Sequence, residues 1–352
     1  MNKRIGFFLI IILYSCANIV APIGGAKDQL APKVESITLL RDSKDSYEKT
    51  IKFVFNEYIQ LNSWEDYFYI SPPIKKSKKK IKGNLLLLTI TDSLDKNTSY
   101  NICLNSCIKD NNEGNILDTL NYIYNDQNSE LLGGKLVDAY TLKELENFWV
   151  MLFNEQMHDS LIFKSSPIYI SKTDKNGLYH FPNLKSKKYK LVAINGYDFI
   201  YNNDELIAFS DKIINSKTDS FITLFAFNPQ IDNDKVDSLL INYSLDTLIS
   251  KNEISNYGQI EIITKDSMSA IFQLLQKDKV VSEFYFDKKP YLINKILAGK
   301  YQLKYILDNN NDKIFSTGDW LERRQPEKVF NYPSEILIRS NWNLELEWII
   351  SE

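Results

Sequence analysis

Residues 83–90 read Gly83-Asn84-Leu85-Leu86-Leu87-Leu88-Thr89-Ile90, a turn pair followed by a short apolar run. Upstream, residues 50–55 are rich in β-branched and aromatic side chains that alternate with polar ones, as expected of a strand with one buried face. Further runs of this kind lie at residues 36–40, 68–70, 99–104 and 122–124. Short strands at about ten-residue spacing, separated by turn clusters, predict a β-sandwich.

Similar runs continue along the rest of the chain. They lie at residues 134–139, 149–153 and 189–193, and then at 221–227, 259–263, 270–275, 283–286, 302–307 and 336–339. Asp174-Lys175-Asn176-Gly177 is predicted to form a hairpin turn, because Asn and Gly tolerate positive φ. Residues 297–303 repeat the pattern of residues 184–191, which predicts a third β-sandwich. The fold class is therefore all-β, with β-sandwich domains in tandem.

The N-terminus has the pattern of a secretory signal peptide. Lys3 and Arg4 precede an apolar run over residues 5–13, followed by Ser15 and Cys16. Leu13-Tyr14-Ser15-Cys16 resembles the lipobox of bacterial lipoproteins, which implies cleavage before Cys16 and lipidation, including palmitate, on that thiol. An ordinary signal peptide with an accidental cysteine is the alternative. The run is shorter than the roughly 20 apolar residues that a membrane-spanning helix needs.

Several short motifs occur in a characteristic order after Cys16. They are residues 18–28, 53–59, 70–73, 97–100 and 110–115. Together they resemble the Ig-like-domain lipoproteins of Gram-negative outer membranes. Residues 129–216, the second module, resemble the small transthyretin-like or carboxypeptidase-regulatory-like β-sandwich. Such modules carry no peptidase residues.

These patterns divide the chain into five segments. We expect a signal peptide at 1–15, a lipidated cysteine and flexible tether at 16–33, a bacterial Ig-like sandwich at 34–128, a carboxypeptidase-regulatory-like sandwich at 129–216 and a third sandwich-like domain at 217–352. The predicted location is the outer membrane, through the lipid anchor, with the periplasmic or cell-surface face left open.

The charge balance argues against a nucleic-acid partner. Removal of Lys3 and Arg4 from the 42 basic residues leaves 40, against 45 acidic ones. A protein that binds nucleic acid usually carries an excess of basic residues over its binding face. The mature chain is instead slightly acidic.

Motifs of catalysis are missing from the sequence. His158 and His180 are the two histidines of the chain, and neither has metal-ligand spacing with the other or with Cys103 or Cys107. The sequence also lacks a Gly-x-Ser-x-Gly elbow and a phosphate-binding glycine loop. We therefore predict that the protein is not an enzyme.

Oxygen-bearing side chains alternate between residues 308 and 319. The possible ligands of a calcium loop there are Asp308, Asn310, Asp312, Ile314 through its carbonyl, Ser316 and Asp319. Two features depart from such loops. Lys313 stands where a calcium loop has Gly for its sharp turn, and Asp319 is shorter than the usual bidentate Glu. The alternative is a plain Asx-rich turn.

A run of lysines follows Ser71-Pro72-Pro73. It consists of Lys75, Lys76, Lys78, Lys79, Lys80 and Lys82. The simplest interpretation is a solvated hairpin arm whose charges prevent edge-to-edge pairing. The functional alternative is contact with anionic lipid head groups or an acidic partner.

The thiols of Cys103 and Cys107 are four residues apart. In a continuous strand their Cα atoms would be about 13 Å apart, too far for a disulfide. We expect two unbonded thiols, with a bonded pair as the alternative if the chain turns between them.

The expected function combines a lipid anchor with interaction modules and no catalysis. It is that of a structural or protein-interaction subunit of an envelope assembly, with outer-membrane β-barrel or other envelope proteins as partners and a role in outer-membrane protein biogenesis or export. The second hypothesis is a surface glycan-binding lipoprotein, in which some of the chain's five Trp residues stack on sugars. A hydrolase in the last domain is the third.

Overall fold

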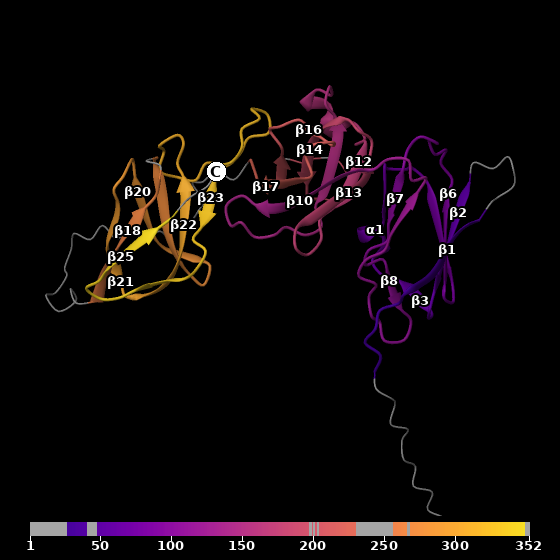
Figure 1. The fold of residues 1–352 in the computed structure, drawn as a ribbon, viewed down its shortest axis with the longest axis horizontal. Helices are drawn as coiled ribbons and strands as arrows, with labels where there is room; N and C mark the ends of the chain where they lie inside the picture. Colours follow the sequence, from indigo (N-terminus) through magenta and orange to yellow (C-terminus); the bar gives the residue numbers. More distant parts are fainter. Residues whose placement is uncertain are drawn as a thin grey trace, which may run out of the picture.

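The computed structural model describes residues 27–40, 48–196, 199, 201–202, 204–229, 256–265 and 268–348. Cys16 and the predicted signal peptide lie outside these residues. The described part of the chain folds into three β-sandwiches that follow one another along the longest axis of the molecule (Figure 1).

The first sandwich contains an antiparallel sheet in the order β1-β2-β6-β5. Its strands are β1 (Val34–Leu40), β2 (Lys49–Phe55), β6 (Leu85–Ile90) and β5 (Ser77–Lys82). The opposing layer contains β4 (Tyr69–Ser71), β7 (Tyr100–Cys103), β9 (Asn121–Tyr124), the pair β3 (Ile59–Leu61) and β8 (Ile108–Asp110), and the helix α1 (Trp64–Tyr67). Alternation in β2 buries Ile51, Phe53 and Phe55 completely, which confirms the predicted strand at 50–55.

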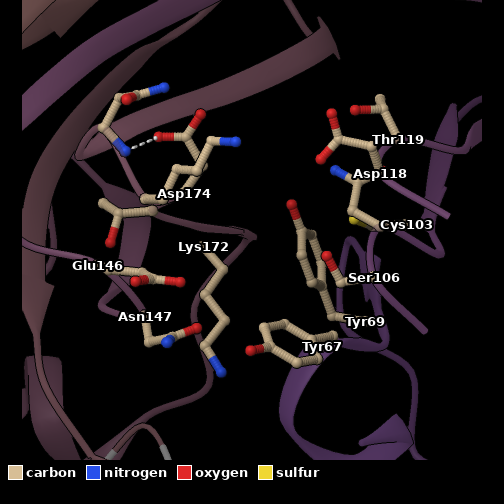
Figure 2. Close-up of a pocket in the computed structure, with 14 residues that line it drawn as sticks. Tyr67, Tyr69, Cys103, Ser106, Asp118, Thr119, Glu146, Asn147, Lys172 and Asp174 are labelled. Carbon is tan, nitrogen blue, oxygen red and sulfur yellow. Dashed lines mark hydrogen bonds between the residues drawn. The ribbon is translucent and has the colours of Figure 1, made fainter. Parts of the chain in front are cut away.

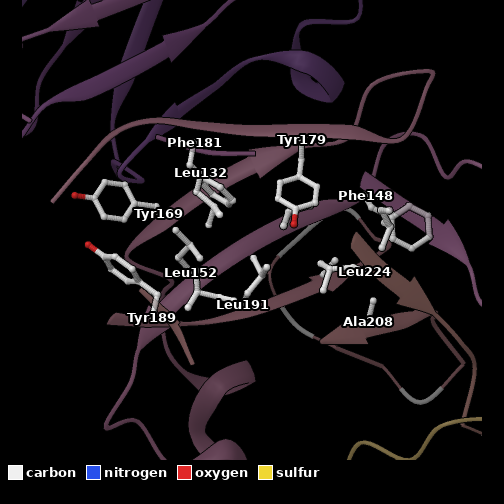
Figure 3. Packing of buried hydrophobic residues seen from close by; sticks show 14 of the residues in the cluster. Leu132, Phe148, Leu152, Tyr169, Tyr179, Phe181, Tyr189, Leu191, Ala208 and Leu224 are labelled. Atoms are coloured by element: carbon white, nitrogen blue, oxygen red, sulfur yellow. The ribbon is translucent and has the colours of Figure 1, made fainter. Parts of the chain in front are cut away.

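The second sandwich packs two sheets face to face. One has the order β13 (Leu178–Leu184), β10 (Glu130–Asp138) and β17 (Phe221–Ala226). The other contains β12 (Tyr169–Lys172), β11 (Trp149–Asn154), β14 (Lys188–Ile194), β15 (Ile207–Phe209) and β16 (Ile214–Asn215), and a 3₁₀ helix, η2 (Asp159–Lys164), follows β11. Figure 3 shows Leu132, Leu152, Phe181 and Leu224 meeting between them.

The third sandwich repeats this topology strand for strand. One sheet has the order β21 (Tyr291–Leu297), β18 (Tyr257–Ile263) and β25 (Asn343–Glu347). The other contains β20 (Lys279–Phe286), β19 (Ala270–Gln276), β22 (Gly299–Leu307), β23 (Val329–Asn331) and β24 (Ile336–Ile338). In both domains the last strand lies parallel to the first, β17 beside β10 and β25 beside β18. The predicted third β-sandwich is therefore present.

Three predicted features need correction. The division at 216/217 is wrong, because β17 pairs with β10 and belongs to the second sandwich. The turn at Asp174 forms, with Gly177 at φ 70°, but it connects β12 to β13 across the two sheets and is not a hairpin. The end of the predicted tether is docked on the first sandwich, since the side chain of Asn115 donates to the carbonyls of Asp28 and Leu30.

The first two sandwiches meet through specific contacts. The backbone N–H of Ile170 donates to the Ser71 hydroxyl at 3.0 Å, and both residues are buried. The rings of Tyr69 and Trp149 pack edge to face at 5.7 Å. The ammonium of Lys172 lies 4.8 Å from the centre of the Trp149 ring and donates to the backbone carbonyl of Asp66. Buried polar contacts of this kind fix the relative position of two domains.

A long connection within the third sandwich packs against the second sandwich. We name residues 308–328, between β22 and β23, the β22–β23 arm. Trp320 of this arm is buried against the second sandwich, with its ring 5.2 Å from that of Phe209. Arg323 donates to the Ser210 carbonyl at 3.2 Å, and Gln325 donates to the Phe209 carbonyl at 2.8 Å. The arm therefore fastens the third domain to the second.

Within the described residues, no helix is long and apolar enough to cross a membrane.

Candidate functional site

The predicted lysine run forms most of β5, which lies at one edge of its sheet and pairs with β6. Strand alternation separates its side chains. Lys78, Lys80 and Lys82 point to the outer face of the sheet, opposite Thr89, Leu87 and Leu85 of β6. A charged edge strand discourages pairing with another chain, as the simpler interpretation of this run expected.

The other lysines of the run have different positions. Lys79 faces inward, where its ammonium contacts the Glu65 carboxylate at 2.5 Å and lies 4.9 Å from the centre of the Trp64 ring. Lys75 and Lys76 precede β5 in the loop, and both donate their backbone N–H to Asp92. The six lysines therefore do not act as one cluster, and Lys79 has a structural role.

The outer face of this sheet is basic and partly apolar. The register of β1, β2, β6 and β5 aligns three rows of residues: Leu40, Thr50, Thr89 and Lys78; Thr38, Lys52, Leu87 and Lys80; Ser36, Val54, Leu85 and Lys82. None of these twelve positions is acidic. We name this surface the basic face. It stands out because the whole chain has a formal net charge of −3.

A cleft with a volume of about 280 Å³ lies between the first two sandwiches (Figure 2). Tyr67, Tyr69 and Asp118 line one side, and Glu146 and Lys172 line the other. The cleft has charges of both signs. Burial lowers the pKa of Lys172, but its ammonium already binds the Asp66 carbonyl. We therefore interpret the cleft as part of the interface between the two domains.

Cys103 and Cys107 are free and buried, which confirms the expectation of unbonded thiols. Burial raises the pKa of both thiols, so their reactive thiolate forms are disfavoured. Burial also raises the pKa of the Tyr69 phenol, which hydrogen-bonds Cys103, well above its ordinary value. The two cysteines therefore pack as small apolar residues.

The predicted calcium loop begins the β22–β23 arm. The buried Asp308 carboxylate accepts the backbone N–H groups of Asp312 and Lys313, at 3.2 and 3.1 Å. The Asn310 amide donates to Asp312 at 2.7 Å and to Ser316 at 2.9 Å, and Ile314 N–H donates to Asp312 at 2.9 Å. Lys313 adopts a positive φ of 66°, the conformation for which calcium loops use Gly. The loop is thus a set of Asx turns.

Asp319 does not join the other predicted ligands. Its carboxylate accepts the backbone N–H groups of Leu321 and Glu322 in the following turn. Glu327, which the sequence did not single out, accepts N–H groups of the loop at Asn309 and Ser316. Among the residues that the structure describes, no three His, Cys, Asp or Glu side chains are placed to hold a metal ion.

The two histidines make separate structural contacts. His158 caps η2 and contacts Ser160 at 2.8 Å, whereas His180 lies on β13 and binds Ser171 through its backbone.

The tryptophans separate into two groups. Trp64, Trp149, Trp320 and Trp348 are buried in the cores and interfaces. Packing therefore accounts for most of the tryptophans that were considered for sugar stacking. Trp342 is 62% exposed and lines a pocket of about 380 Å³ in the third domain. The sequence did not distinguish it from the others.

A family comparison assigns the first domain. Residues 28–124 match a sequence model described as a bacterial Ig-like domain. The first sandwich is a bacterial Ig-like domain. The match covers well under half of the chain, and the resemblance of the second domain to a transthyretin-like module stays a prediction. No curated protein matches the sequence.

Solved structures give weak similarities. Fervidolysin from Fervidobacterium pennivorans, a keratinolytic enzyme related to subtilisin, has 10% identity and a TM-score of 0.20, over 54% of this chain and 25% of that one. The Bacillus anthracis TIE protein has 14% identity and a TM-score of 0.20, over 90% and 58%. A streptococcal ancillary pilin has 10% identity and a TM-score of 0.19, over 78% and 80%. This chain thus spans a quarter of fervidolysin and just over half of TIE, and these scores carry no functional argument.

Proposed function

We propose that this chain is a non-catalytic surface protein, lipid-anchored at the outer membrane through Cys16, that serves as a structural and protein-interaction subunit of an envelope assembly. Its predicted partners are β-barrel or other envelope proteins, with outer-membrane protein biogenesis or export as the proposed setting. The Ig-like domain and the tandem sandwiches support a role in interaction rather than in catalysis.

The observation that carries this proposal is that neighbouring domains pack against each other through specific contacts at both interfaces. Ser71 and Ile170 join the first two domains through a buried hydrogen bond, and Trp320 of the β22–β23 arm joins the last two. A chain of domains fixed in this way holds its side surfaces at defined distances from one another. That property suits a subunit that bridges proteins.

The basic face supports the same proposal at one end of the molecule. Lys52, Lys78 and Lys80 lie around the apolar side chains of Leu85 and Leu87 on the outer face of the sheet. Such a surface suits an acidic protein partner or anionic head groups, because charge attraction and apolar burial act together.

Affinity purification of the tagged, lipidated protein from membranes in mild detergent tests the proposal. We expect stoichiometric integral outer-membrane proteins in the eluate, identified by mass spectrometry. A Cys16→Ala variant is the control for the anchor and should no longer fractionate with membranes. Recovery of the wild-type lipoprotein alone would count against the assembly role.

Glycan binding is the second candidate function. A single feature favours it: Trp342 is exposed beside a pocket, while the other tryptophans of the chain are buried.

A further inference from the structure

Trp342 departs from the way the chain uses its other tryptophans. Trp64, Trp149, Trp320 and Trp348 are 6–7% exposed, whereas Trp342 is 62% exposed. Tryptophan is the largest aromatic side chain, and leaving it in water forgoes its apolar burial. Exposed aromatic side chains beside a pocket are typical of binding surfaces rather than of structural packing.

The backbone around Trp342 is fixed. Trp342 accepts a hydrogen bond from Gln259 N–H at 3.0 Å, and Asn341 N–H donates to the Tyr257 carbonyl at 2.8 Å. Gly258 permits this close approach, because a Cβ there would lie 2.5 Å from the Arg339 carbonyl oxygen. The loop between β24 and β25 is thus tied to β18, and the exposed ring is held on a rigid support.

The pocket beside the ring combines apolar and polar walls. Leu337, Leu344 and Leu346 contribute apolar surface, and Gln259, Ser334, Glu335 and Arg339 contribute polar groups. Its volume of about 380 Å³ is within the range of small-molecule sites.

Three polar side chains of the pocket have no hydrogen-bond or ion-pair partner in the described part of the chain. The side chains of Gln259, Ser334 and Glu335 make no hydrogen bond or ion pair there, and the Arg339 guanidinium lies 5.4 Å from the centre of the Trp342 ring. An amide, a hydroxyl, a carboxylate and a guanidinium are therefore available to a ligand. They supply both donors and acceptors.

We infer that this pocket binds a carbohydrate, with one sugar ring stacked on Trp342. The inference rests on the second candidate function, glycan binding, and not on the assembly role. The pocket carries one cation, Arg339, and one anion, Glu335, so it matches a neutral ligand better than a nucleic acid or an anionic lipid. A sugar presents a face of C–H groups to the indole and hydroxyls around its rim, which need the mixed donors and acceptors found here.

Binding to a panel of immobilised glycans tests this inference with the full-length mature protein. The probes are dextran, laminarin, mannan, chitin oligosaccharides and purified bacterial O-polysaccharide, and calorimetry follows with soluble oligosaccharides of any that bind. We expect saturable binding to at least one probe and a loss of at least roughly tenfold in affinity for Trp342→Ala, the size of effect seen when an aromatic stacking partner is removed. Glu335→Gln and Gln259→Ala should weaken binding less.

Tyr58→Ala is the matched control, because Tyr58 is an aromatic residue of the first domain with 67% exposure. It should bind glycans like the wild type. Trp342 fluorescence gives an independent measure, since bound sugar should protect this exposed indole from acrylamide quenching.

The outcomes of these experiments distinguish a failure of the Trp342 site from a failure of the glycan-binding function. If the wild type binds none of the probes, both the site and the glycan-binding function are overturned. Glycan binding that Trp342→Ala leaves unchanged would overturn the site alone. Loss of a co-purified protein in Trp342→Ala, without glycan binding by the wild type, would overturn the carbohydrate assignment in favour of a protein ligand.

Discussion

Tyr189 and Tyr301 make the same hydrogen bond in two different domains. The Tyr189 hydroxyl donates to the Lys185 carbonyl at 2.9 Å, and the Tyr301 hydroxyl donates to the Leu297 carbonyl at 3.0 Å, in each case four residues earlier. Both tyrosines stand near the start of the equivalent strands β14 and β22. The second and third domains therefore share a side-chain detail as well as a strand order.

Replacing either tyrosine by Phe should destabilise its own domain. The ring would stay buried, but the carbonyl of Lys185 or Leu297 would lose its donor, which costs about 1 kcal/mol. Hydrogen exchange of the two domains measures the effect separately, since each variant should speed exchange in one domain. Tyr58→Phe is the control and should change neither. Equal effects on both domains from one substitution would contradict the prediction.

Trp320→Ala should detach the β22–β23 arm from the second domain. Trp320 is 6% exposed and packs on Phe209 and beneath the Arg323 guanidinium, which lies 4.7 Å from the centre of its ring. Truncation of a buried tryptophan typically costs about 3–5 kcal/mol. Limited proteolysis should then cut within residues 308–328, and small-angle scattering should show greater variation in domain spacing.

The neighbouring Leu321 provides the control for that experiment. Leu321 is 90% exposed. Leu321→Ala should leave proteolysis and scattering as in the wild type. If Trp320→Ala also behaves like the wild type, the arm does not hold the two domains together.

Charge reversal of the basic face should strongly weaken binding to an anionic surface. Lys78, Lys80 and Lys82 share one face, and each lysine near an anionic membrane contributes about 1 kcal/mol. The triple change to Glu should therefore lower the affinity of the unlipidated protein for anionic vesicles at least roughly a hundredfold in flotation assays. The same change at Lys187, Lys188 and Lys212 of the second domain is the control. Equal flotation with neutral and anionic vesicles would leave a protein partner as the ligand of this face.

The sequence predicted the positions of the strands reliably. Residues 50–55 alternate because one face packs on the core, so their periodicity reports on burial. Residues 85–90 are an apolar run in which burial alternates although the sequence does not. Pairing was not predictable in the same way. The run at 221–227 has strand character, but nothing local shows that β17 crosses back to lie parallel to β10 of the second domain.

The candidate site was harder to predict because exposure depends on tertiary position. Trp342 and Trp348 lie six residues apart at the two ends of β25, and the sequence treats them alike. Trp348 packs against Tyr332 in the core. Trp342 is held outside by the backbone hydrogen bond that its carbonyl accepts from Gln259 N–H. The lysine run was visible in the sequence, but only the strand showed that Lys79 faces inward.

The Asp308 loop should not respond to millimolar calcium. Its carboxylates already accept the backbone N–H groups of Lys313 and Ile314, and Asp319 serves a separate turn. Calorimetric titration of the purified protein with calcium should give no heat of binding beyond dilution. A saturable heat that Asp308→Asn removes would show that the loop can rearrange into a cation site.

Lys304 should make stability rise with pH in the alkaline range. Its ammonium donates to the Tyr140 carbonyl at 2.9 Å and lies 4.1 Å from the centre of that ring, at the contact between the second and third domains. Burial lowers the pKa of Lys304 from 10.5 to about 8 in the folded protein. Between these two values the unfolded chain holds a proton that the folded chain has lost, so unfolding takes up a proton.

The free energy of unfolding should therefore increase from about pH 8 to pH 10, relative to a Lys304→Met variant that keeps the apolar stem and removes the titration. Below pH 8 both states of the wild type are protonated, so the two proteins should differ by a constant amount. Denaturant unfolding at pH 7, 8, 9 and 10 measures the difference. Parallel curves for wild type and variant over this range would show that the Lys304 ammonium is not desolvated at the interface, and that the contact with Tyr140 is open to water.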